Sequence, residues 1–240
     1  MLISWLKIAT SILFTGVMAI AALLTAPFTK KGDFYHGIAK NWSRGLLTIS
    51  GVRLIVEGAN LLNPDKSYIY IANHASQFDI PAILAGIPDQ IRIVYKKELE
   101  KIPVFGWSLK FNKTYISINR SRGESALHSL EAAALKIRAG TSVILFAEGT
   151  RSPDGNLQPF KRGPFNLAVQ AGVPVVPVTI NGSYAILPKY SSRIRPGTIS
   201  LTISDPIYPA RGSGKNTELE LRDKVHEAIF KNLHTPRMNT

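Results

Sequence analysis

The sequence of 240 residues contains no cysteine and no Gly-x-Ser-x-Gly motif. The usual sequence marks of covalent catalysis through a cysteine or serine nucleophile are therefore missing. The five histidines are dispersed, and no set of His, Asp and Glu has the spacing of metal ligands, so we expect no metal site. Acidic residues are also few, because 16 Asp and Glu stand against 29 Lys and Arg.

The resulting net charge of +13 predicts an anionic partner. Nucleic acid is one such partner, but the sequence has no zinc-finger spacing, no RNP-like aromatic motif and no long Lys/Arg tract. Anionic lipid headgroups are another, and they attract each basic residue near the membrane by about 1 kcal/mol. We therefore expect binding to anionic membrane lipids and not to nucleic acid.

A long uncharged segment, Ile8 to Thr29, supports a membrane location. As a helix it would extend about 33 Å, against a hydrocarbon core of about 30 Å. Lys30 and Lys31 follow it, and the charge rule then favours a cytoplasmic position for the rest of the chain.

Other interpretations of this segment remain. Gly16 and Pro27 permit a bent helix that enters and lies in one leaflet. Alanines near the end of the segment imitate a signal-peptide cleavage site, although the apolar run is longer than a usual signal core. A buried core helix is disfavoured by the length of the segment and its lack of a polar face.

The stretch from Ile71 to Asp79 places His74 and Asp79 where an apolar strand gives way to a helix. A neutral imidazole there can accept a proton from a substrate hydroxyl, and a carboxylate on its other ring nitrogen can fix the tautomer. A structural alternative is a Ser-x-x-Asp capping box formed by Ser76 and Asp79. Amides at the start of the following helix are candidate oxyanion donors.

A second apolar strand, beginning at Val143, ends in Glu148, Gly149, Thr150 and Arg151. Ligands of α/β sheets gather at the carboxyl ends of strands, so the two loops can form one site. Arg151 is suited to bidentate binding of a phosphate or carboxylate, and Glu148 can orient that guanidinium or a substrate hydroxyl. A surface ion pair that closes a turn is the structural alternative.

Two further segments carry weaker signals. A short alternating strand from Lys113 ends in Arg120, and such a basic residue is usually a solvated strand end. The apolar run Val173 to Ile180 contains prolines, which are typical of an edge strand.

The set and order of these four segments resemble the glycerolipid acyltransferases, most closely the 1-acyl-sn-glycerol-3-phosphate acyltransferases. Asn-His-x4-Asp at 73–79 is similar to the family's catalytic block, and Phe-Ala-Glu-Gly-Thr-Arg-Ser at 146–152 to its acceptor-binding block. Arg120 occupies the place of the phosphate-binding arginine, and 173–178 matches the proline-bearing block. The resemblance covers roughly Ser67 to Ile180.

The resemblance implies acyl transfer from a thioester to the sn-2 hydroxyl of lysophosphatidic acid, giving phosphatidic acid. His74 would deprotonate the hydroxyl, Asp79 would orient His74, and no acyl-enzyme is required. No cofactor is implied, because acyl-CoA or acyl-carrier protein is a co-substrate whose charge suits the basic surface. The family also implies the cytoplasmic face of the bacterial inner membrane.

The acceptor phosphate requires cations. The candidate acceptor-binding residues are Arg120, Arg151, Lys96, Lys97, Lys161, Glu148, Gly149 and Thr150. Related enzymes acylate other lysolipids, so another lysolipid is an alternative acceptor. A hydrolase that uses water at the same His/Asp pair, or a non-catalytic basic protein that binds membrane lipid, is an alternative function.

The expected fold is α/β, with a mixed central sheet covered by helices and a membrane-associated helical segment at 1–50 before an acyltransferase domain at 51–240. Strands are expected at 52–57, 68–73, 91–95, 113–118, 142–147, 175–180 and 198–204. Helices are expected at 34–51, 80–86, 124–139, 163–170 and 217–233. His128 and His226 are expected on helix surfaces, and His36 and His234 have no predicted partner.

Overall fold

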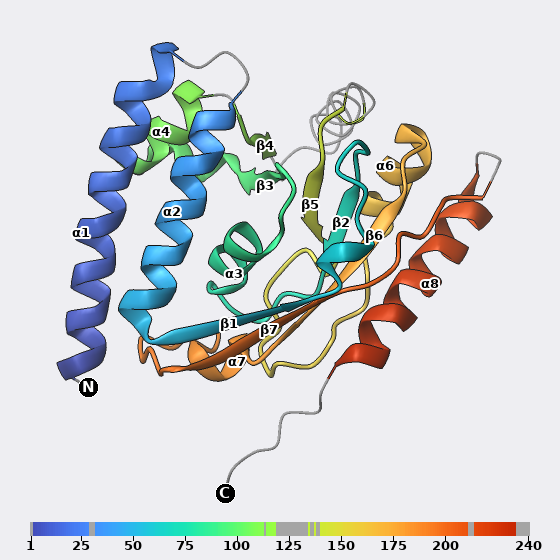
Figure 1. Cartoon of the computed structure of the whole chain (residues 1–240). Helices are drawn as coiled ribbons and strands as arrows, with labels where there is room; N and C mark the ends of the chain where they lie inside the picture. Colours follow the sequence, from blue (N-terminus) through green and yellow to red (C-terminus); the bar gives the residue numbers. More distant parts are fainter. Residues whose placement is uncertain are drawn as a thin grey trace, which may run out of the picture.

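A computed structural model describes residues 2–28, 32–112, 114–118, 134, 137, 140–210 and 214–233. Its centre is a seven-stranded sheet in the order β1-β7-β6-β2-β5-β3-β4 (Figure 1). The strands are β1 Val52–Glu57, β2 Ile69–Ala72, β3 Arg92–Lys96, β4 Ile116–Ile118, β5 Val143–Phe146, β6 Val175–Asn181 and β7 Gly197–Ile203. The helices are α1 Leu2–Thr25, α2 Asp33–Ser50, α3 Asp79–Gly86, α4 Phe105–Asn112, α6 Gly163–Ala171, α7 Ser183–Ile186 and α8 Lys215–Asn232.

The sheet is mixed, because β6 and β7 are antiparallel and the other neighbouring strands are parallel. The predicted α/β class with a mixed sheet is confirmed. The expected strands lie within one residue of those observed, except that β4 begins at Ile116. Four of the five expected helices lie within two residues of α2, α3, α6 and α8.

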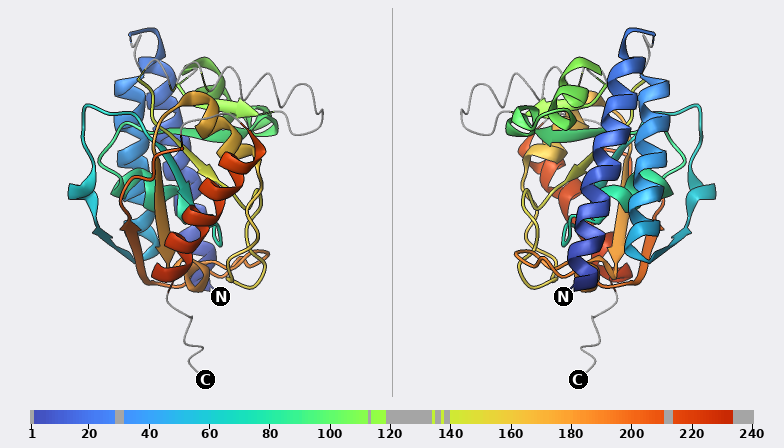
Figure 2. Two further views of the ribbon diagram at one scale, coloured as in Figure 1. Left: turned by 90° about the vertical axis from the view of Figure 1, so that its right-hand side faces the viewer. Right: turned by 90° about the vertical axis from the view of Figure 1, so that its left-hand side faces the viewer.

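Alternate residues of β2 face two separate cores. Tyr70 and Ala72 pack into a core with α2 and α3, whereas Ile69 and Ile71 pack against α6 and α8. Successive side chains of a strand point to opposite faces, and here both faces are covered, so all four residues are buried. Figure 2 shows α8 on one side of the sheet and the pair α1 and α2 on the other.

Pro177 contradicts the expectation that the proline-bearing run forms an edge strand. It lies in β6, which pairs with both β2 and β7. Its missing N–H is tolerated because pairing with β7 begins only at Val178, while Val175 bridges to Ile207. Between these contacts the Pro177 carbonyl accepts a hydrogen bond from Ser204 N at 3.0 Å.

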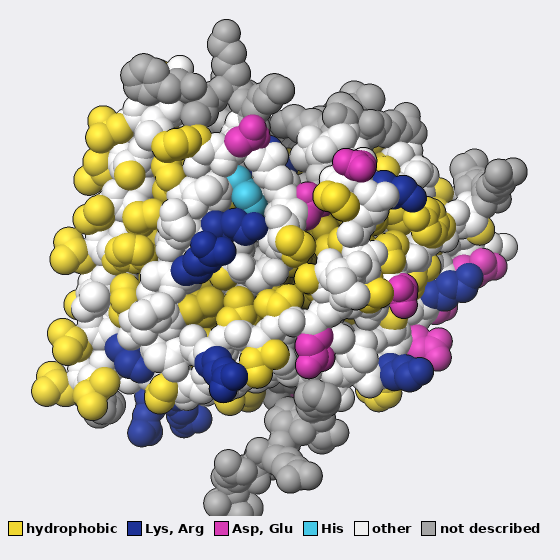
Figure 3. All heavy atoms as spheres, in the orientation of Figure 1, with side chains coloured by type: hydrophobic (Ala, Val, Ile, Leu, Met, Phe, Trp, Pro, Cys, Tyr) yellow, Lys and Arg dark blue, Asp and Glu magenta, His cyan; other side chains and the backbone are white. Residues whose placement is uncertain are grey.

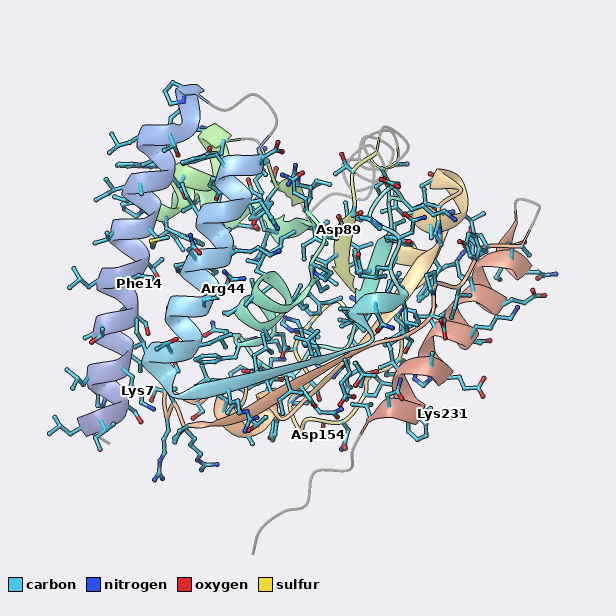
Figure 4. All side chains as sticks on the ribbon, viewed as in Figure 1. Lys7, Phe14, Arg44, Asp89, Asp154 and Lys231 are labelled. Carbon is cyan, nitrogen blue, oxygen red and sulfur yellow. The ribbon has the colours of Figure 1, made fainter. Side chains whose placement is uncertain are left out.

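The amino-terminal helix differs from the expected segment at both ends. It begins at Leu2 and ends at Thr25, and it includes Lys7, whose Nζ donates to the Ser50 carbonyl at 2.7 Å. α1 and α2 lie side by side in Figures 1 and 2, and Phe14, labelled in Figure 4, points from α1 against Gly45 of α2.

The helix α4 was not predicted, because Gly106 reads as a break in the sequence. In the structure a Cβ at Gly106 would overlap the backbone of Leu99 and Glu100, so glycine allows α4 to pack closely on the preceding 3-10 helix Lys97–Lys101. Most of the expected helix at 124–139, together with Lys113 and Arg120, lies outside the described residues.

Two histidines outside the motifs are partly or fully buried. His226 was expected on the surface, but it is half-buried on α8 with its ring 5.0 Å from that of Phe160. His36 is 5% exposed on α2, and burial together with Lys40 and Arg92 lowers its pKa to about 4. A buried neutral imidazole follows from this arrangement.

Candidate active site

His74 lies in the loop between β2 and α3, with its ring nitrogen Nδ1 2.7 Å from Asp79 Oδ2. Its side chain is 17% exposed, whereas the Asp79 side chain is fully buried. The His74 ring also stacks on Phe146 at the end of β5, with the centroids 4.0 Å apart. The carboxylate and the phenyl ring fix the imidazole, and because Nδ1 is engaged, Nε2 is the nitrogen available for proton transfer.

The same Asp79 oxygen also organises the backbone. Oδ2 accepts hydrogen bonds from Ala75 N at 2.8 Å and from Ser76 N at 2.9 Å. Asp79 Oδ2 therefore both orients the His74 ring and accepts the loop amides, so the catalytic and the capping interpretation are compatible. The Phe78 N–H donates in turn to Ser76 Oγ at 3.2 Å, so Ser76 and Asp79 make the reciprocal bonds of a cap just before α3.

These bonds engage loop amides that precede α3, so the oxyanion donors expected at the start of that helix stay a prediction. The amides of Ala75 and Ser76 point at Asp79, and the Phe78 amide donates to Ser76 Oγ at 3.2 Å. The amides that follow His74 at 75, 76 and 78 are thus already used within the loop.

Glu148 joins the loop after β5 to His74. Its Oε1 accepts the His74 N–H at 2.7 Å, and its Oε2 accepts the Gln158 N–H at 3.3 Å. The Ser152 N–H donates in turn to the His74 carbonyl at 2.7 Å. We expected Glu148 to orient Arg151 or a substrate hydroxyl; instead, its buried carboxylate holds backbone amides, and burial raises its pKa to about 7.

Five of the predicted acceptor-binding residues, Lys96 among them, line one cavity with His74. Gly149, Thr150, Arg151 and Lys161 share a cavity of about 1420 Å³. Gly149 has φ +76°, and a Cβ there would come within 2.8 Å of Lys161 Nζ, so glycine keeps the Lys161 side chain close to the loop.

The two neighbouring lysines differ. Lys96, at the end of β3, lines the cavity, although its Nζ is 3.7 Å from Glu98 Oε1 at the surface. Lys97 is exposed and is not among the residues that line the cavity. Lys96 is therefore placed to contact a ligand in the cavity, whereas a contact of Lys97 with a ligand stays a prediction. Arg120, the remaining predicted cation, lies outside the described residues.

The rest of the cavity is largely apolar. It extends between α1, α2 and α4, where its walls include Met18, Ala19, Ile38, Trp42 and Leu109. Cations at the mouth and a long apolar interior suit a molecule with a charged head and a hydrocarbon chain. In the part of the chain that the structure describes, no group of three or more His, Cys, Asp or Glu could hold a metal ion.

Asn73 and Ser76 support the site through bonds that the sequence did not indicate. The Asn73 side chain donates to the Ile180 carbonyl at 2.9 Å and accepts from the Ile180 N–H at 2.8 Å. Ser76 Oγ donates to the Leu187 carbonyl at 2.8 Å. Both side chains bind backbone groups more than 100 residues away, and no local sequence pattern indicates such partners.

The sequence matches the family described as Acyltransferase over residues 53–181. The chain belongs to the acyltransferase family. The match contains both motif loops of the site, and the resemblance inferred from those motifs is confirmed.

Several members of the acyltransferase family are similar over most of this chain. The 1-acyl-sn-glycerol-3-phosphate acyltransferase of Pseudomonas aeruginosa is 32% identical, over 92% of this chain and 85% of its own length. A chloroplastic one from Brassica napus is 32% identical over 90% of this chain, but the match spans only 63% of that protein. The crystal structure of the LPA acyltransferase PlsC from Thermotoga maritima superimposes with a TM-score of 0.80 at 28% identity, covering 96% of this chain and 92% of that one.

Proposed function

We propose that this acyltransferase moves a fatty acyl chain from acyl-CoA or acyl-carrier protein to the sn-2 hydroxyl of lysophosphatidic acid, giving phosphatidic acid. The observation that carries the proposal is the position of His74, bonded to Asp79, in a largely apolar cavity that Arg151 and Lys161 also line. The names of the relatives from Pseudomonas and Brassica support the same acceptor.

In the proposed reaction, His74 Nε2 removes the proton from the acceptor hydroxyl while its oxygen attacks the thioester carbonyl carbon. The C–O bond forms, the C–S bond of the tetrahedral intermediate breaks, and the thiolate leaves. The imidazolium returns its proton to that thiolate as general acid, so His74 is neutral again. Asp79 holds the Nδ1–H and stabilises the imidazolium between the two transfers.

The remaining residues position the acceptor. Arg151 and Lys161 would bind its phosphate through charge-assisted hydrogen bonds, with Lys96 as a further cation. Thr150 and Gly149 would approach the glycerol head, because a glycine leaves room beside the backbone. We keep Arg120 as a phosphate-binding residue on the resemblance alone. Glu148 acts through the His74 amide, and Lys97 stays a predicted contact of the acceptor.

We further propose that α1 lies in one leaflet of the membrane and does not span it. α1 is apolar and long enough to span, and Figure 3 shows hydrophobic side chains along its edge of the molecule. Yet Ser4 Oγ donates to the Ile194 carbonyl at 3.4 Å near one end, and Asn112 Nδ2 donates to the Ala22 carbonyl at 3.2 Å near the other.

Both ends of α1 are thus bonded to the α/β body, whereas a spanning helix leaves one end on the far side of the membrane. An in-plane helix with its apolar side toward lipid satisfies both observations. Because α1 and α2 line the cavity, acyl chains could then enter it from that leaflet. We place the protein on the cytoplasmic face, where thioester donors are made, and propose no cofactor beyond the donor.

The acceptor is tested by incubating the detergent-solubilised protein with lysophosphatidic acid, with lysophosphatidylcholine and with monoacylglycerol, and measuring both product lipid and free thiol. The proposal expects stoichiometric phosphatidic acid and thiol with lysophosphatidic acid. Transfer to lysophosphatidylcholine in preference would identify another lysolipid as the acceptor. Thiol release without any acylated product would instead establish hydrolysis.

A further inference from the structure

A basic segment that the proposed function does not use lies beside the cavity. Between α7 and β7, residues 187–196 contain Lys189, Arg193 and Arg195 and no acidic residue. We call residues 188–195 the basic turn. Arg193 and Arg195 are exposed, while the intervening Ile194 is buried, so both guanidinium groups lie on the side away from the core. Neither one has an ion pair within the described ranges.

Tyr190 gives the basic turn an unusual conformation. The Ser191 N–H donates to the Pro188 carbonyl at 3.1 Å and closes a four-residue turn. Tyr190, the third residue of that turn, has φ +69° in the left-handed region, where turns usually place glycine or asparagine. Tyr190 is 88% exposed, and among the described residues the one cation–π or ring-stacking contact of its ring is with Lys189 Nζ, 5.2 Å from the ring centroid. A strained, solvent-exposed aromatic residue has no packing role and points to a ligand.

The basic turn borders the catalytic site. Leu187, Ser191 and Ile194 line the same cavity as His74. Ser76, in the His74 loop, donates to the Leu187 carbonyl, and Lys189 Nζ lies 3.4 Å from Thr150 Oγ1. A ligand held on the basic turn is therefore at the mouth of the cavity that contains His74.

The proposed reaction has two substrates that carry phosphate, and two sets of cations lie at or beside the cavity. Arg151 and Lys161, which line the cavity, serve the acceptor phosphate, and this leaves the adjoining basic turn for the other substrate. A coenzyme A thioester ends in an adenosine nucleotide with three phosphate groups, and its long flexible arm separates this end from the thioester. Arginines bind phosphate oxygens in a bidentate manner, and an exposed aromatic ring stacks on a nucleobase.

We propose that the basic turn binds the adenosine-phosphate end of an acyl-CoA donor, with Arg193 and Arg195 on the phosphates and the Tyr190 ring against the adenine. This inference rests on the proposed function, since it names the donor for the same site. An acidic carrier protein would match the cations but would give the strained Tyr190 ring no planar partner. Anionic lipid headgroups also match the charge, tyrosine is common at the membrane interface, and the Ser4–Ile194 bond brings the basic turn next to α1, so binding of anionic vesicles is the rival outcome of the test.

The test compares two donors with the same acyl chain, acyl-CoA and acyl-pantetheine, which lacks the nucleotide. The variants are Arg193→Gln/Arg195→Gln and Tyr190→Gly, because glycine removes the ring while suiting the positive φ. The matched control is Lys215→Gln/Lys224→Gln, which removes the same charge from the exposed side of α8. All four proteins are assayed in uncharged detergent with lysophosphatidic acid.

We expect the double arginine variant to raise the KM for acyl-CoA about tenfold, and Tyr190→Gly to raise it about threefold, while the KM for acyl-pantetheine changes less than about twofold. Adenosine 3′,5′-bisphosphate should compete with acyl-CoA in the wild type and bind about tenfold more weakly to the arginine variant by calorimetry. The control should match the wild type in both measurements.

Parallel changes with the two donors would overturn the inference. A larger rise in the KM for an acyl-carrier protein thioester than for acyl-CoA in the double arginine variant would also overturn it and would identify the carrier protein as the ligand of the basic turn. So would a double arginine variant that loses only its binding to anionic vesicles. The calorimetric measurement needs no acyl transfer. If the wild type transfers acyl groups from no donor, the proposed function fails, while binding of adenosine 3′,5′-bisphosphate that depends on Arg193 and Arg195 still decides the site.

Discussion

Substituting Asp79 by Asn and by Ala separates the two tasks of its Oδ2 atom. Asp79→Ala leaves the buried amides of Ala75 and Ser76 without an acceptor. Each buried unsatisfied donor costs about 1–3 kcal/mol, so the free energy of unfolding should fall by about 2–6 kcal/mol. Asp79→Asn keeps an oxygen in this position, and the free energy of unfolding should fall by only about 1 kcal/mol.

The effect of Asp79→Asn on catalysis should be far larger than its effect on stability. Two unit charges about 4 Å apart attract each other by about 4 kcal/mol at an effective dielectric constant of about 20. Loss of this attraction to the His74 imidazolium, at about 1.4 kcal/mol per factor of ten, predicts a fall in kcat of about 10²–10³.

The assay combines urea unfolding with the rate of phosphatidic acid formation, each measured for both variants and for the control Asp65→Asn. Asp65 is exposed and should change neither quantity. Activity of Asp79→Asn within about threefold of the wild type would show that the carboxylate charge does not act on His74. A free energy of unfolding for Asp79→Ala equal to that of the wild type would refute the role of Oδ2 as acceptor for the amides of Ala75 and Ser76.

Three further predictions concern stability and its pH dependence. Gly149→Ala should lower the free energy of unfolding by about 1–2 kcal/mol, because φ is +76°, and should raise the KM for lysophosphatidic acid by displacing Lys161. Folding raises the Glu148 pKa to about 7, so the contribution of Glu148 to the free energy of unfolding falls as pH rises from about 5 to 7. Glu148→Gln should remove this pH-dependent contribution of about 2 kcal/mol, as measured by urea titrations at several pH values. Folding lowers the His36 pKa to about 4, so the contribution of His36 to the free energy of unfolding falls as pH drops from 7 to 5, and His36→Leu should remove this dependence of about 2 kcal/mol. If the free energy of unfolding of either variant depends on pH as that of the wild type does, the assignment for that residue is refuted.

Most of the fold follows from local patterns. The strand ends are predicted closely because apolar β-branched runs stop at polar or glycine residues, as β5 does before Glu148. Helices with clear amphipathic spacing, such as α2 and α8, are predicted equally well. α4 is missed because Gly106 is explained only by its contact with Leu99, and Pro177 misleads because its tolerance depends on an interrupted pairing with β7.

The site is predictable as a set of side chains but not as a network. The spacing of His74 and Asp79 across a strand-to-helix turn indicated a contact, and the structure shows it at 2.7 Å, but the spacing alone did not separate catalysis from capping. The partners of Glu148 could not be predicted, because a carboxylate after a strand binds either a cation or backbone amides, depending on which loops pack against it. The bonds of Asn73 to Ile180 likewise depend on the neighbouring strand β6. Contacts between residues far apart in the sequence can be predicted only when the order of the strands in the sheet is known.

The central claim is that His74 is the general base of direct acyl transfer. It is tested by the initial rate of phosphatidic acid formation from lysophosphatidic acid and an acyl thioester, measured for the wild type and for His74→Ala at equal concentrations of folded protein. The account predicts a fall of about 10³-fold in His74→Ala, within the contribution that general-base catalysis makes. A rate for His74→Ala within about tenfold of the wild type would contradict it.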